Sequence, residues 1–439
     1  MGAGKTSAVT KFAAWLNGKG LRVGLVANDQ GVGLVDGLRM GRARAVPLNL
    51  TREITGGCFC CKADELMATL RELNEAGRPE VILAEPVGSC TDLVATVVRP
   101  LEQVYAAGYR MAPMSVVVDV LRLRGSGPAA LVAPEDEDAH ESPRNREGTI
   151  RSAVPGFSAA VSYIYQKQME EAGVLVLNKV DLLSKQQRAE VSGWVRAKFP
   201  DKTVLEVSTK TGEGLEAWFE HLLNHEHWDA GTLELDYDLY AEGEALLGWY
   251  NAELSVHGVR GAFDGNRLLR QLAQEVQAAL ELAGAGIAHF KMSLERSHAV
   301  DFPAASGPLR KAGRRGPQRE HPRSDLGIVQ VAAQGMRPEL TETLGSDLVV
   351  GKLLVNLRAE AEPAVLAEAV RTAMRSKAVR FVWLERAAFK PGRPAPVHRL
   401  DARGKQQLPK KKPTETERIL TPAKDTKRRK TILKKAPHA

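Results

Sequence analysis

Three of the four cysteines in this 439-residue chain lie within four positions, in Gly57-Cys58-Phe59-Cys60-Cys61. Thiolates are soft ligands that suit Zn²⁺, Cu(I) or Co²⁺ and disfavour Mg²⁺. Three sulfurs this close in sequence can reach one ion and leave a fourth position for water, a partner's ligand or a substrate. A closed structural zinc site usually takes four ligands from two separated pairs, so the spacing predicts an exchangeable metal site. The alternative is a set of buried or redox-active thiols.

The N-terminus carries the end of a phosphate-loop pattern, comprising Gly2, Ala3, Gly4, Lys5, Thr6 and Ser7. In the full pattern, G-x-x-x-x-G-K-[ST], backbone N–H groups wrap the phosphates, the lysine neutralises their charge and the hydroxyl reaches Mg²⁺. The helix that follows directs its positive end at the same phosphates. The first glycine of the pattern and the strand that usually precedes it are missing. We therefore expect a truncated start, the alternative being a chance Gly-Lys-Thr.

Two later motifs follow strand-like runs and predict a guanine site. The pattern N-K-x-D follows Val174–Leu177, and a Ser-Thr-Lys loop follows Thr203–Val207. In GTPases the aspartate of N-K-x-D accepts hydrogen bonds from the guanine base, while the asparagine and lysine brace the loop and the ring. The residues that we assign to the base are Asn178, Lys179, Asp181, Ser208, Thr209 and Lys210.

An acidic motif, Glu85-Pro86-Val87-Gly88, follows the strand-like run Val81–Ala84. Here a GTPase needs an acidic group near Mg²⁺ and a glycine whose N–H can bond the γ-phosphate. Asp29 ends the first strand-like run and can hold Mg²⁺ together with Thr6. Phosphoryl transfer depends on positioning and charge neutralisation, so we predict a catalytic set made of Lys5, Asp29, Glu85 and Gly88.

Together these motifs resemble the GTPases with Glu in the third nucleotide motif, which include the urease and hydrogenase nickel-insertion GTPases. The pattern Gly-Cys-x-Cys-Cys resembles that of the cobalamin-synthesis-W-like metallochaperones. The resemblance covers roughly residues 1–225 and implies a doubly wound fold, GTP hydrolysis with Mg²⁺, and a nucleotide-dependent homodimer. It also implies delivery of a divalent metal, Zn²⁺ or another thiophilic ion such as Co²⁺, to a client metalloprotein, with Cys58, Cys60 and Cys61 as ligands. The second half does not show that subfamily's C-terminal pattern.

The fourth cysteine, Cys90, comes two residues after Gly88, in the segment that should move when the γ-phosphate leaves. As a fourth ligand in one nucleotide state only, it would couple metal affinity to hydrolysis. The alternative is a small, buried, apolar cysteine. Both interpretations stay open at the level of sequence.

The elements that must position these residues alternate between strand and helix over residues 1–225, which predicts a mostly parallel α/β sheet. The resemblance implies that this sheet is doubly wound. We expect a GTPase domain over 1–228, interrupted by an inserted loop at 125–148 that is rich in Pro and charge. Helix-like and strand-like runs over 233–390 predict a smaller α+β domain. The remainder, 391–439, reads as a disordered basic tail.

Net charge is concentrated at the C-terminus. Residues 401–439 hold 13 Lys and Arg against 4 acidic residues, a net charge of +9, which leaves about −1 for the rest of a chain whose total is +8. The tail has no interleaved aromatic residues, so stacking on nucleic acid is not expected. No apolar run reaches the length of a membrane span, and four cysteines do not make a disulfide framework. We expect a cytoplasmic protein without a membrane partner.

Two rival functions remain open from the sequence. The first alternative is a GTP-dependent regulator or scaffold that senses metal and binds a partner without transferring the ion. The second is an inactive, truncated phosphate-loop protein, which a GTP-binding measurement would identify.

Overall fold

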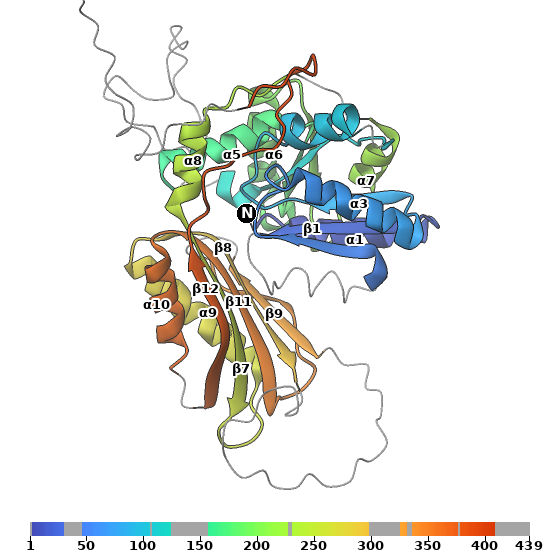
Figure 1. Cartoon of the computed structure of the whole chain (residues 1–439). Coiled ribbons are helices and arrows are strands. Elements are labelled where there is room, and N and C mark those ends of the chain that lie inside the picture. Colours follow the sequence, from blue (N-terminus) through green and yellow to red (C-terminus); the bar gives the residue numbers. More distant parts are fainter. Residues whose placement is uncertain are drawn as a thin grey trace, which may run out of the picture.

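The computed structural model describes residues 2–29, 46–105, 108–123, 157–226, 231–297, 325–331, 336–375 and 378–408. The chain forms an α/β part and a separate antiparallel sheet, which lies below it in Figure 1. The inserted loop expected at 125–148 and the tail beyond 408 lie outside the described residues.

The α/β part holds short parallel strands and the helices between them. Its strands are β1 (Val23–Asp29), β2 (Thr51–Thr55), β3 (Val81–Glu85), β4 (Ser115–Asp119), β5 (Val174–Asn178) and β6 (Thr203–Val207). Its helices are α1 (Lys5–Gly18), α3 (Ala63–Gly77), α5 (Ala159–Glu171), α6 (Lys185–Lys198), α7 (Leu215–Asn224) and α8 (Tyr237–Leu246). Short helical turns cover Leu48–Leu50 (η1), Val94–Val98 (η2), Pro100–Val104 (η3) and Val180–Leu182 (η4). The predicted parallel α/β class is therefore confirmed.

The parallel strands are divided between two sheets, with the orders β2-β1-β3 and β4-β5-β6. Strand β5 shows why helices cover both faces. Val174 and Val176 pack into the core that contains α1 and α7, whereas Leu175 and Leu177 pack into the core that contains α5 and α6. All of these side chains are apolar because a parallel strand with two covered faces has no solvent side. The first of these cores also includes β1, so it joins the two sheets.

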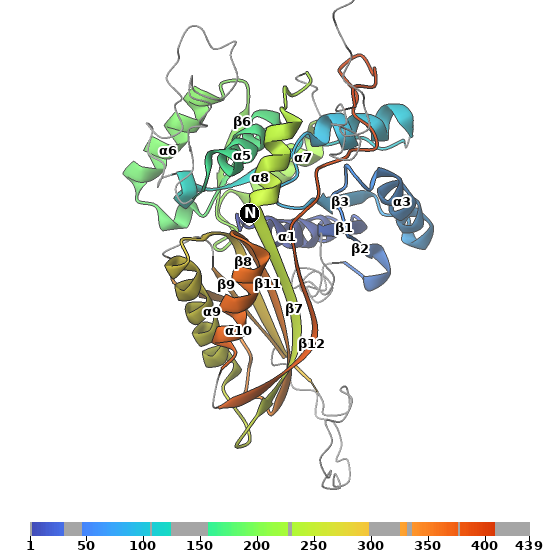
Figure 2. The same ribbon diagram turned by 60° about the vertical axis from the view of Figure 1, so that its left-hand side comes forward.

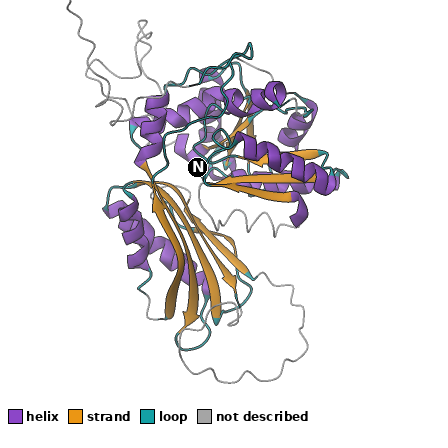
Figure 3. Cartoon of the chain, in the orientation of Figure 1, coloured by secondary structure: helices purple, strands orange, loops and turns teal. Residues whose placement is uncertain are grey.

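The second part is a two-layer α+β structure, as predicted. Its strands are β7 (Leu247–Gly258), β8 (Gly286–Arg296), β9 (Leu326–Val331), β10 (Glu339–Glu342), β11 (Val350–Glu360) and β12 (Val379–Phe389), and its helices are α9 (Gly265–Leu282) and α10 (Pro363–Ala373). The strands form one antiparallel sheet in the order β10-β9-β8-β11-β7-β12. Helices α9 and α10 cover one face of it (Figures 2 and 3).

Helix α9 shows how sequence periodicity builds this layer. Leu269, Leu272, Val276 and Leu280 recur every three or four residues, and all are buried against the sheet. Burial of one such side chain contributes about 1.5–3 kcal/mol to folding. This stripe faces the core, while charged residues of the same helix face water.

The two parts contact each other directly. Helix α8 packs on α5 and runs without a gap into β7, which carries the chain from one part to the other (Figure 2). Ser158 N donates a hydrogen bond to Glu360 Oε2 at 2.8 Å, and Arg122 Nη2 donates to Ala288 O at 3.1 Å. No helix among the described residues is long and apolar enough to cross a membrane.

One expectation needs correction. Composition predicts a disordered tail from residue 391 onward, but residues 391–408 have defined contacts on the α/β part. In Figure 1 this segment, which we call the strap, continues from β12 and runs up across the α/β part. Buried bonds hold it: Leu400 N donates to Ala95 O at 2.9 Å, and Arg399 Nε donates to Asp92 Oδ2 at 2.6 Å. Low average hydrophobicity misled the prediction because a few buried residues, Pro394, Pro396 and Leu400, together with buried polar partners, order the strap.

Candidate functional site

The end of the phosphate loop leads directly into α1. Gly4 precedes the helix with φ +98°, in the left-handed region that favours glycine. A Cβ at this position would lie 2.3 Å from Asn178 Nδ2, so no larger residue fits without movement of the asparagine. Lys5 and Thr6 begin the helix, at the end where unpaired N–H groups and the helix dipole attract anions.

Thr6 and Glu85 meet at the predicted magnesium position. The buried Thr6 hydroxyl donates a hydrogen bond to Glu85 Oε1 at 3.0 Å. Mg²⁺ prefers hard oxygen ligands, and a hydroxyl beside a carboxylate fits that preference. Asp29 ends the neighbouring strand β1, but its side chain lies outside the described residues. The assignment of these residues to Mg²⁺ stays a prediction.

Asn178 connects the two halves of the predicted nucleotide site. Its side chain is fully buried, and Nδ2 donates to Ala3 O at 2.6 Å and to Thr209 Oγ1 at 3.1 Å. Its Oδ1 accepts from Thr209 N at 2.9 Å. The loop after β6 is therefore held beside the end of the phosphate loop.

The remaining predicted guanine residues lie in the same region. Ser208 Oγ donates to Asp181 Oδ1 at 2.6 Å, which fixes the carboxylate expected to bind the base. Lys179 adopts φ +71° and pairs with the buried Asp119 at 2.5 Å. Lys210 points elsewhere, because its Nζ pairs with Glu339 Oε1 of β10 at 2.7 Å. Sequence reasoning missed Asp119, although an acid directly after the apolar run of β4 was an available signal.

The three clustered thiols come together as predicted. The Sγ atom of Cys58 lies 2.6 Å from that of Cys60 and 3.2 Å from that of Cys61, and the Cys60 and Cys61 sulfurs are 3.8 Å apart. All three sulfurs can contact one ion, and the cluster sits just before α3. Hydrogen bonds from the Cys60 and Cys61 thiols lower the pKa of the Cys58 thiol, which favours the thiolate that a metal needs. The donor set fits a thiophilic ion.

Asn28, at the end of β1, holds the cysteine loop. Its Nδ2 donates to Ile54 O at 3.0 Å and to Gly57 O at 2.7 Å, while its Oδ1 accepts from Phe59 N at 3.0 Å. Phe59 is buried in the core beneath the loop. Asn28 immediately precedes Asp29, so a predicted magnesium ligand and the thiol loop share one strand end.

Cys90 lies beside the trio. It is 5% exposed and shares an apolar cluster with Cys58, Cys60, Val87 and Trp249. Interaction with the Cys58 thiol, followed by burial, raises the pKa of the Cys90 thiol. The geometry is compatible with a fourth ligand and with a small buried apolar residue, so its role stays a prediction.

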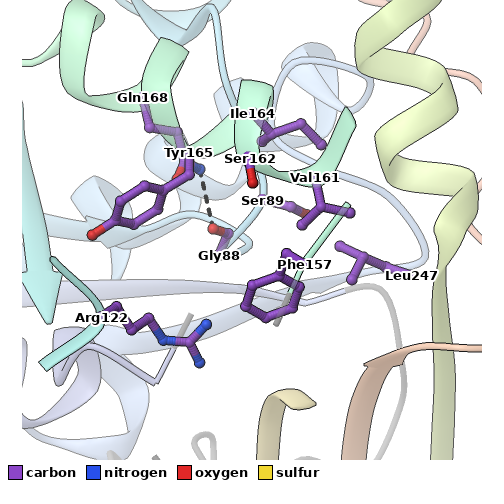
Figure 4. A pocket seen from close by; sticks show the side chains of 10 residues that line it. All are labelled: Gly88, Ser89, Arg122, Phe157, Val161, Ser162, Ile164, Tyr165, Gln168 and Leu247. Carbon is purple, nitrogen blue, oxygen red and sulfur yellow. Dashed lines mark hydrogen bonds between the residues drawn. The ribbon is translucent and has the colours of Figure 1, made fainter. Parts of the chain in front are cut away.

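A small cavity adjoins the loop that carries Gly88. It is lined by Gly88 and Ser89 with residues of α5, Arg122, Phe157 and Leu247, as Figure 4 shows. Gln168 of α5 donates to Gly88 O at 3.1 Å and to Cys90 O at 2.8 Å. The cavity has a volume of about 30 Å³ for water-sized molecules, which is room for about one water and far too little for a nucleotide. Gln168 thus anchors the loop between the predicted γ-phosphate contact and Cys90.

The strap reaches the thiols from the opposite end of the chain. Val397 N donates to Cys60 O at 3.0 Å, and Ala395 N donates to Cys61 Sγ at 3.4 Å. Cys58 and Cys60 are buried, and only Cys61 of the trio is partly exposed. No sequence pattern pointed to these contacts, because they join residues more than 330 positions apart.

Comparison with known proteins gives one family match. Residues 1–206 match the family described as CobW/HypB/UreG, nucleotide-binding domain. None of the curated proteins compared with the chain matches it.

Among solved structures, hydrogenase maturation factor HypB from Archaeoglobus fulgidus matches at 18% identity, covering 51% of this chain and 84% of that chain at a TM-score of 0.30. HypB from Helicobacter pylori, solved in complex with nickel, matches at 16% identity over 50% and 80% at a TM-score of 0.31. Zn(II)-bound YjiA GTPase from E. coli matches at 10% identity over 80% and 98% at a TM-score of 0.22. Similarities at this level add nothing to the family match.

Proposed function

We propose that this protein is a GTP-hydrolysing metallochaperone, because residues 1–206 match the nucleotide-binding domain of the CobW/HypB/UreG family. It binds Zn²⁺, or another thiophilic divalent ion such as Co²⁺, through Cys58, Cys60 and Cys61, and hands the ion to a client metalloprotein. The ion is the cargo of the reaction, while GTP is the substrate.

One observation carries the proposal: both segments predicted to sense the γ-phosphate border the thiol cluster. Asn28 adjoins Asp29 and bonds to Gly57 and Phe59 of the cysteine loop. On the other side, Cys90 follows Gly88 by two residues and lies in one buried cluster with Cys58 and Cys60. A change at either segment therefore reaches the thiols through a single side chain.

Hydrolysis requires groups that hold the phosphates and neutralise their charge. Lys5 and the backbone of Gly2, Ala3 and Gly4 would bind the phosphates, and Thr6 with Glu85 and Asp29 would hold Mg²⁺. The ion would supply charge neutralisation between the phosphate oxygens. Asn178, Lys179 and Asp181, with the loop of Ser208 and Thr209, would select guanine.

Loss of the γ-phosphate would relax the segments at Asp29 and at Glu85–Gly88. Movement of Asn28 and Cys90 would then change the geometry of the thiol site and lower or raise its affinity for the ion. Linkage makes the effect reciprocal, so the ion must also change the affinity for GTP relative to GDP.

The proposal is tested by measuring Zn²⁺ affinity with GDP and with a non-hydrolysable GTP analogue. We expect the two affinities to differ in the wild-type chain, and the ratio to approach one in Cys90→Ser. The triple variant of Cys58, Cys60 and Cys61 to Ser serves as the control that removes the site. An unchanged ratio in Cys90→Ser assigns Cys90 to packing, and equal affinities in the wild type contradict the switch.

Transfer distinguishes delivery from sensing. A regulator or scaffold is favoured by one observation, the contact of the strap with Cys60 and Cys61, which links the site to the C-terminal half. The measurement is metal transfer to a candidate apo-enzyme with and without GTP hydrolysis. Transfer that requires hydrolysis supports delivery, whereas nucleotide-dependent partner binding without transfer supports regulation.

Two further parts of the proposal concern the cell compartment and the oligomeric state. A reducing cytoplasm suits the protein, because all four cysteines are free and the trio must stay reduced to bind metal. A nucleotide-dependent homodimer is expected from the family, and light scattering with GDP and with the GTP analogue tests it.

A further inference from the structure

The Pro-Ala-Pro stretch of the strap presents a single backbone donor. Proline has no N–H, so Ala395 supplies the one amide hydrogen of Pro394-Ala395-Pro396. A residue before a proline is restricted to an extended backbone, so Ala395 loses little freedom when the strap docks. Both prolines are buried, whereas the side chain of Ala395 is exposed. It is therefore the amide of this residue, rather than its methyl group, that contacts the protein.

The Ala395 amide donates to the sulfur of Cys61, and the distance from N to Sγ is 3.4 Å. Cys58 and Cys60 are buried and Cys61 is partly exposed, so the strap meets the trio at its most accessible sulfur. Two residues further on, Val397 N donates to Cys60 O at 3.0 Å. This second bond fixes the strap to the backbone of the cysteine loop.

Metal binding should strengthen the bond between the Ala395 amide and the sulfur. Metal ions bind thiolates, so loading the trio removes its thiol protons and leaves sulfur atoms that can only accept hydrogen bonds. A hydrogen bond to a charged acceptor is roughly twice as strong as one between neutral groups. The amide therefore stabilises the loaded site more than the empty site, which raises the affinity for the ion.

Anchors on both sides hold the donor in place. Upstream, Phe389 of β12 packs against the buried cluster that contains the thiols and stacks on Trp249, with ring centroids 5.6 Å apart. Downstream, Arg399 Nε donates to the buried Asp92 at 2.6 Å. Asp92 comes two residues after Cys90, so the strap joins the cysteine loop to the segment that follows the predicted γ-phosphate contact.

We propose that Ala395 is a positioning residue of the metal site, whose N–H holds the Cys61 thiolate when the ion is bound, so that the strap raises the affinity for the ion. The inference rests on the proposed thiol site and adds a residue from the C-terminal half of the chain. Ala395 acts through Cys61 and does not touch the ion. Displacement of the strap would lower the affinity and favour release.

The test compares Ala395→Pro with Ala395→Ser and Ala402→Pro in the full, reduced chain. Proline removes the N–H at a position whose neighbours are already prolines, whereas serine keeps the N–H and changes only an exposed side chain. Ala402 is exposed at the second position of the turn in which Gly404 N donates to Asp401 O, where proline is tolerated. Its variant therefore places the same ring elsewhere in the strap.

Affinities for Zn²⁺ and Co²⁺ are measured by competition with chromophoric chelators, and thermal unfolding without metal reports on folding. We expect Ala395→Pro to weaken both affinities by about tenfold, the lower end of the effect that outer partners of metal ligands have. The sulfur-to-cobalt charge-transfer band should move to lower energy, because a sulfur without a hydrogen bond gives up its electrons more easily. Ala395→Ser and Ala402→Pro should match the wild type in affinity and spectrum.

A second measurement uses the wild type alone. Hydrogen exchange at the Ala395 amide should slow when Zn²⁺ binds, because its bond to the sulfur becomes stronger. Exchange at Gln407, whose N donates to Arg399 O at 2.7 Å in the same strap, should stay the same. Unchanged exchange at Ala395, or equal slowing at both amides, would overturn the inference.

Two outcomes of the variant experiment overturn the inference while the proposed function survives. The first is wild-type affinity and an unchanged Co²⁺ spectrum in Ala395→Pro. The second is an equal loss of affinity in Ala402→Pro, which would mean a loosened strap rather than a lost donor. Absence of metal binding in the wild type would instead overturn the proposed function, and the inference with it.

Discussion

Single side chains make the long-range connections of the nucleotide site. Asn178 bonds to Ala3 at one end of the site and to Thr209 at the other, and Thr6 bonds to Glu85. These bonds place the phosphate and base segments together before any ligand binds. Preorganisation of this kind reduces the ordering that GTP binding must supply.

Gly4 cannot be replaced without a change in the structure around it. Gly4→Ala places a Cβ 2.3 Å from Asn178 Nδ2 on a backbone with φ +98°, so both the asparagine and the loop must move. We expect a loss of about 1–3 kcal/mol in unfolding free energy from the strained backbone. GTP turnover should fall on the order of 100-fold, because a shift of about 1 Å in the groups that position a substrate has an effect of that size. Thermal unfolding and phosphate release measure the two effects.

Gly18→Ala is the control for this prediction. Gly18 ends α1, and an added Cβ meets nothing within 4 Å, so the variant should keep full turnover and gain up to about 1 kcal/mol. Equal turnover of the two variants would contradict the importance of the Gly4–Asn178 contact.

The carboxyl group of Glu171 should make the stability of the protein depend on pH. Burial raises the pKa of its carboxyl from 4.5 to about 8, and Oε1 accepts from Val94 N at 2.6 Å. The folded protein therefore keeps a proton that the unfolded chain releases above pH 4.5. The contribution of this bound proton to the free energy of unfolding is full below pH 4.5. It is lost as pH rises through about 8, by up to about 1.4 kcal/mol per pH unit.

The variant Glu171→Gln cannot release this proton. Its unfolding free energy should match the wild type near pH 5 and exceed it at pH 8 in denaturant titrations. Glu170→Gln, which removes a carboxylate paired with Lys167 at 2.7 Å, should follow the wild-type profile instead. Parallel curves for Glu171→Gln and the wild type would refute the assignment.

At the scale of elements, strand ends and the loops after them carry the site. The end of β1 holds the cysteine loop, the loop after β3 carries Gly88 and Cys90, and the loops after β5 and β6 carry the residues predicted to contact the base. Ligand sites of open α/β sheets lie at the carboxyl ends of parallel strands for this reason. The thiols join this arrangement because Asn28 fixes their loop to β1.

Asn28→Ala tests that attachment. The variant leaves Phe59 N and the carbonyls of Ile54 and Gly57 without their partner, which should cost about 1–3 kcal/mol. The loop should then respond less to the nucleotide, so Zn²⁺ affinity with GDP and with a GTP analogue should converge. Asn74→Ala, at an exposed position of α3, controls for loss of an amide and should leave both measurements unchanged. A nucleotide-dependent affinity that persists in Asn28→Ala would rule out coupling through β1.

At the scale of the whole molecule, the strap ties the C-terminal half to the α/β part. Asp92 is fully buried and receives hydrogen bonds from Arg399 at 2.6 Å and from Tyr237 at 2.7 Å. Arg99 donates to Leu400 O at 2.7 Å and to Gly231 O at 2.6 Å. These bonds join three distant stretches of chain around one buried carboxylate, so the strap is part of the folded unit.

Arg399→Ala should destabilise the protein by about 3–5 kcal/mol, because it leaves the buried Asp92 charge unpaired. The strap should also loosen over Cys60 and Cys61, so the thiols should react faster with a chromogenic disulfide. Arg393→Ala removes an exposed strap pair with Asp238 and should cost at most about 1 kcal/mol. Similar losses in the two variants, or unchanged thiol rates in Arg399→Ala, would contradict the role of the strap.

The sequence by itself determined the parts that depend on local order. The segments around Gly4-Lys5-Thr6, Glu85 and Asn178-Lys179 carry their chemistry in consecutive residues, so the sequence alone marks them. Strand β7 has no such mark, because its residues are buried on both faces, with Asn251 and Ser255 among them, and no alternation of polar and apolar residues appears.

Only the tertiary structure decided what surrounds the thiols. Cys90, Asn28 and the strap come from three distant stretches of chain, and nothing in their local sequence relates them to Cys58. The order of the strap depends on buried polar partners such as Asp92, which composition does not reveal. The cysteines alone indicated a soft metal site, whereas long-range packing placed the three thiols between two segments predicted to contact the nucleotide and against the second half of the chain.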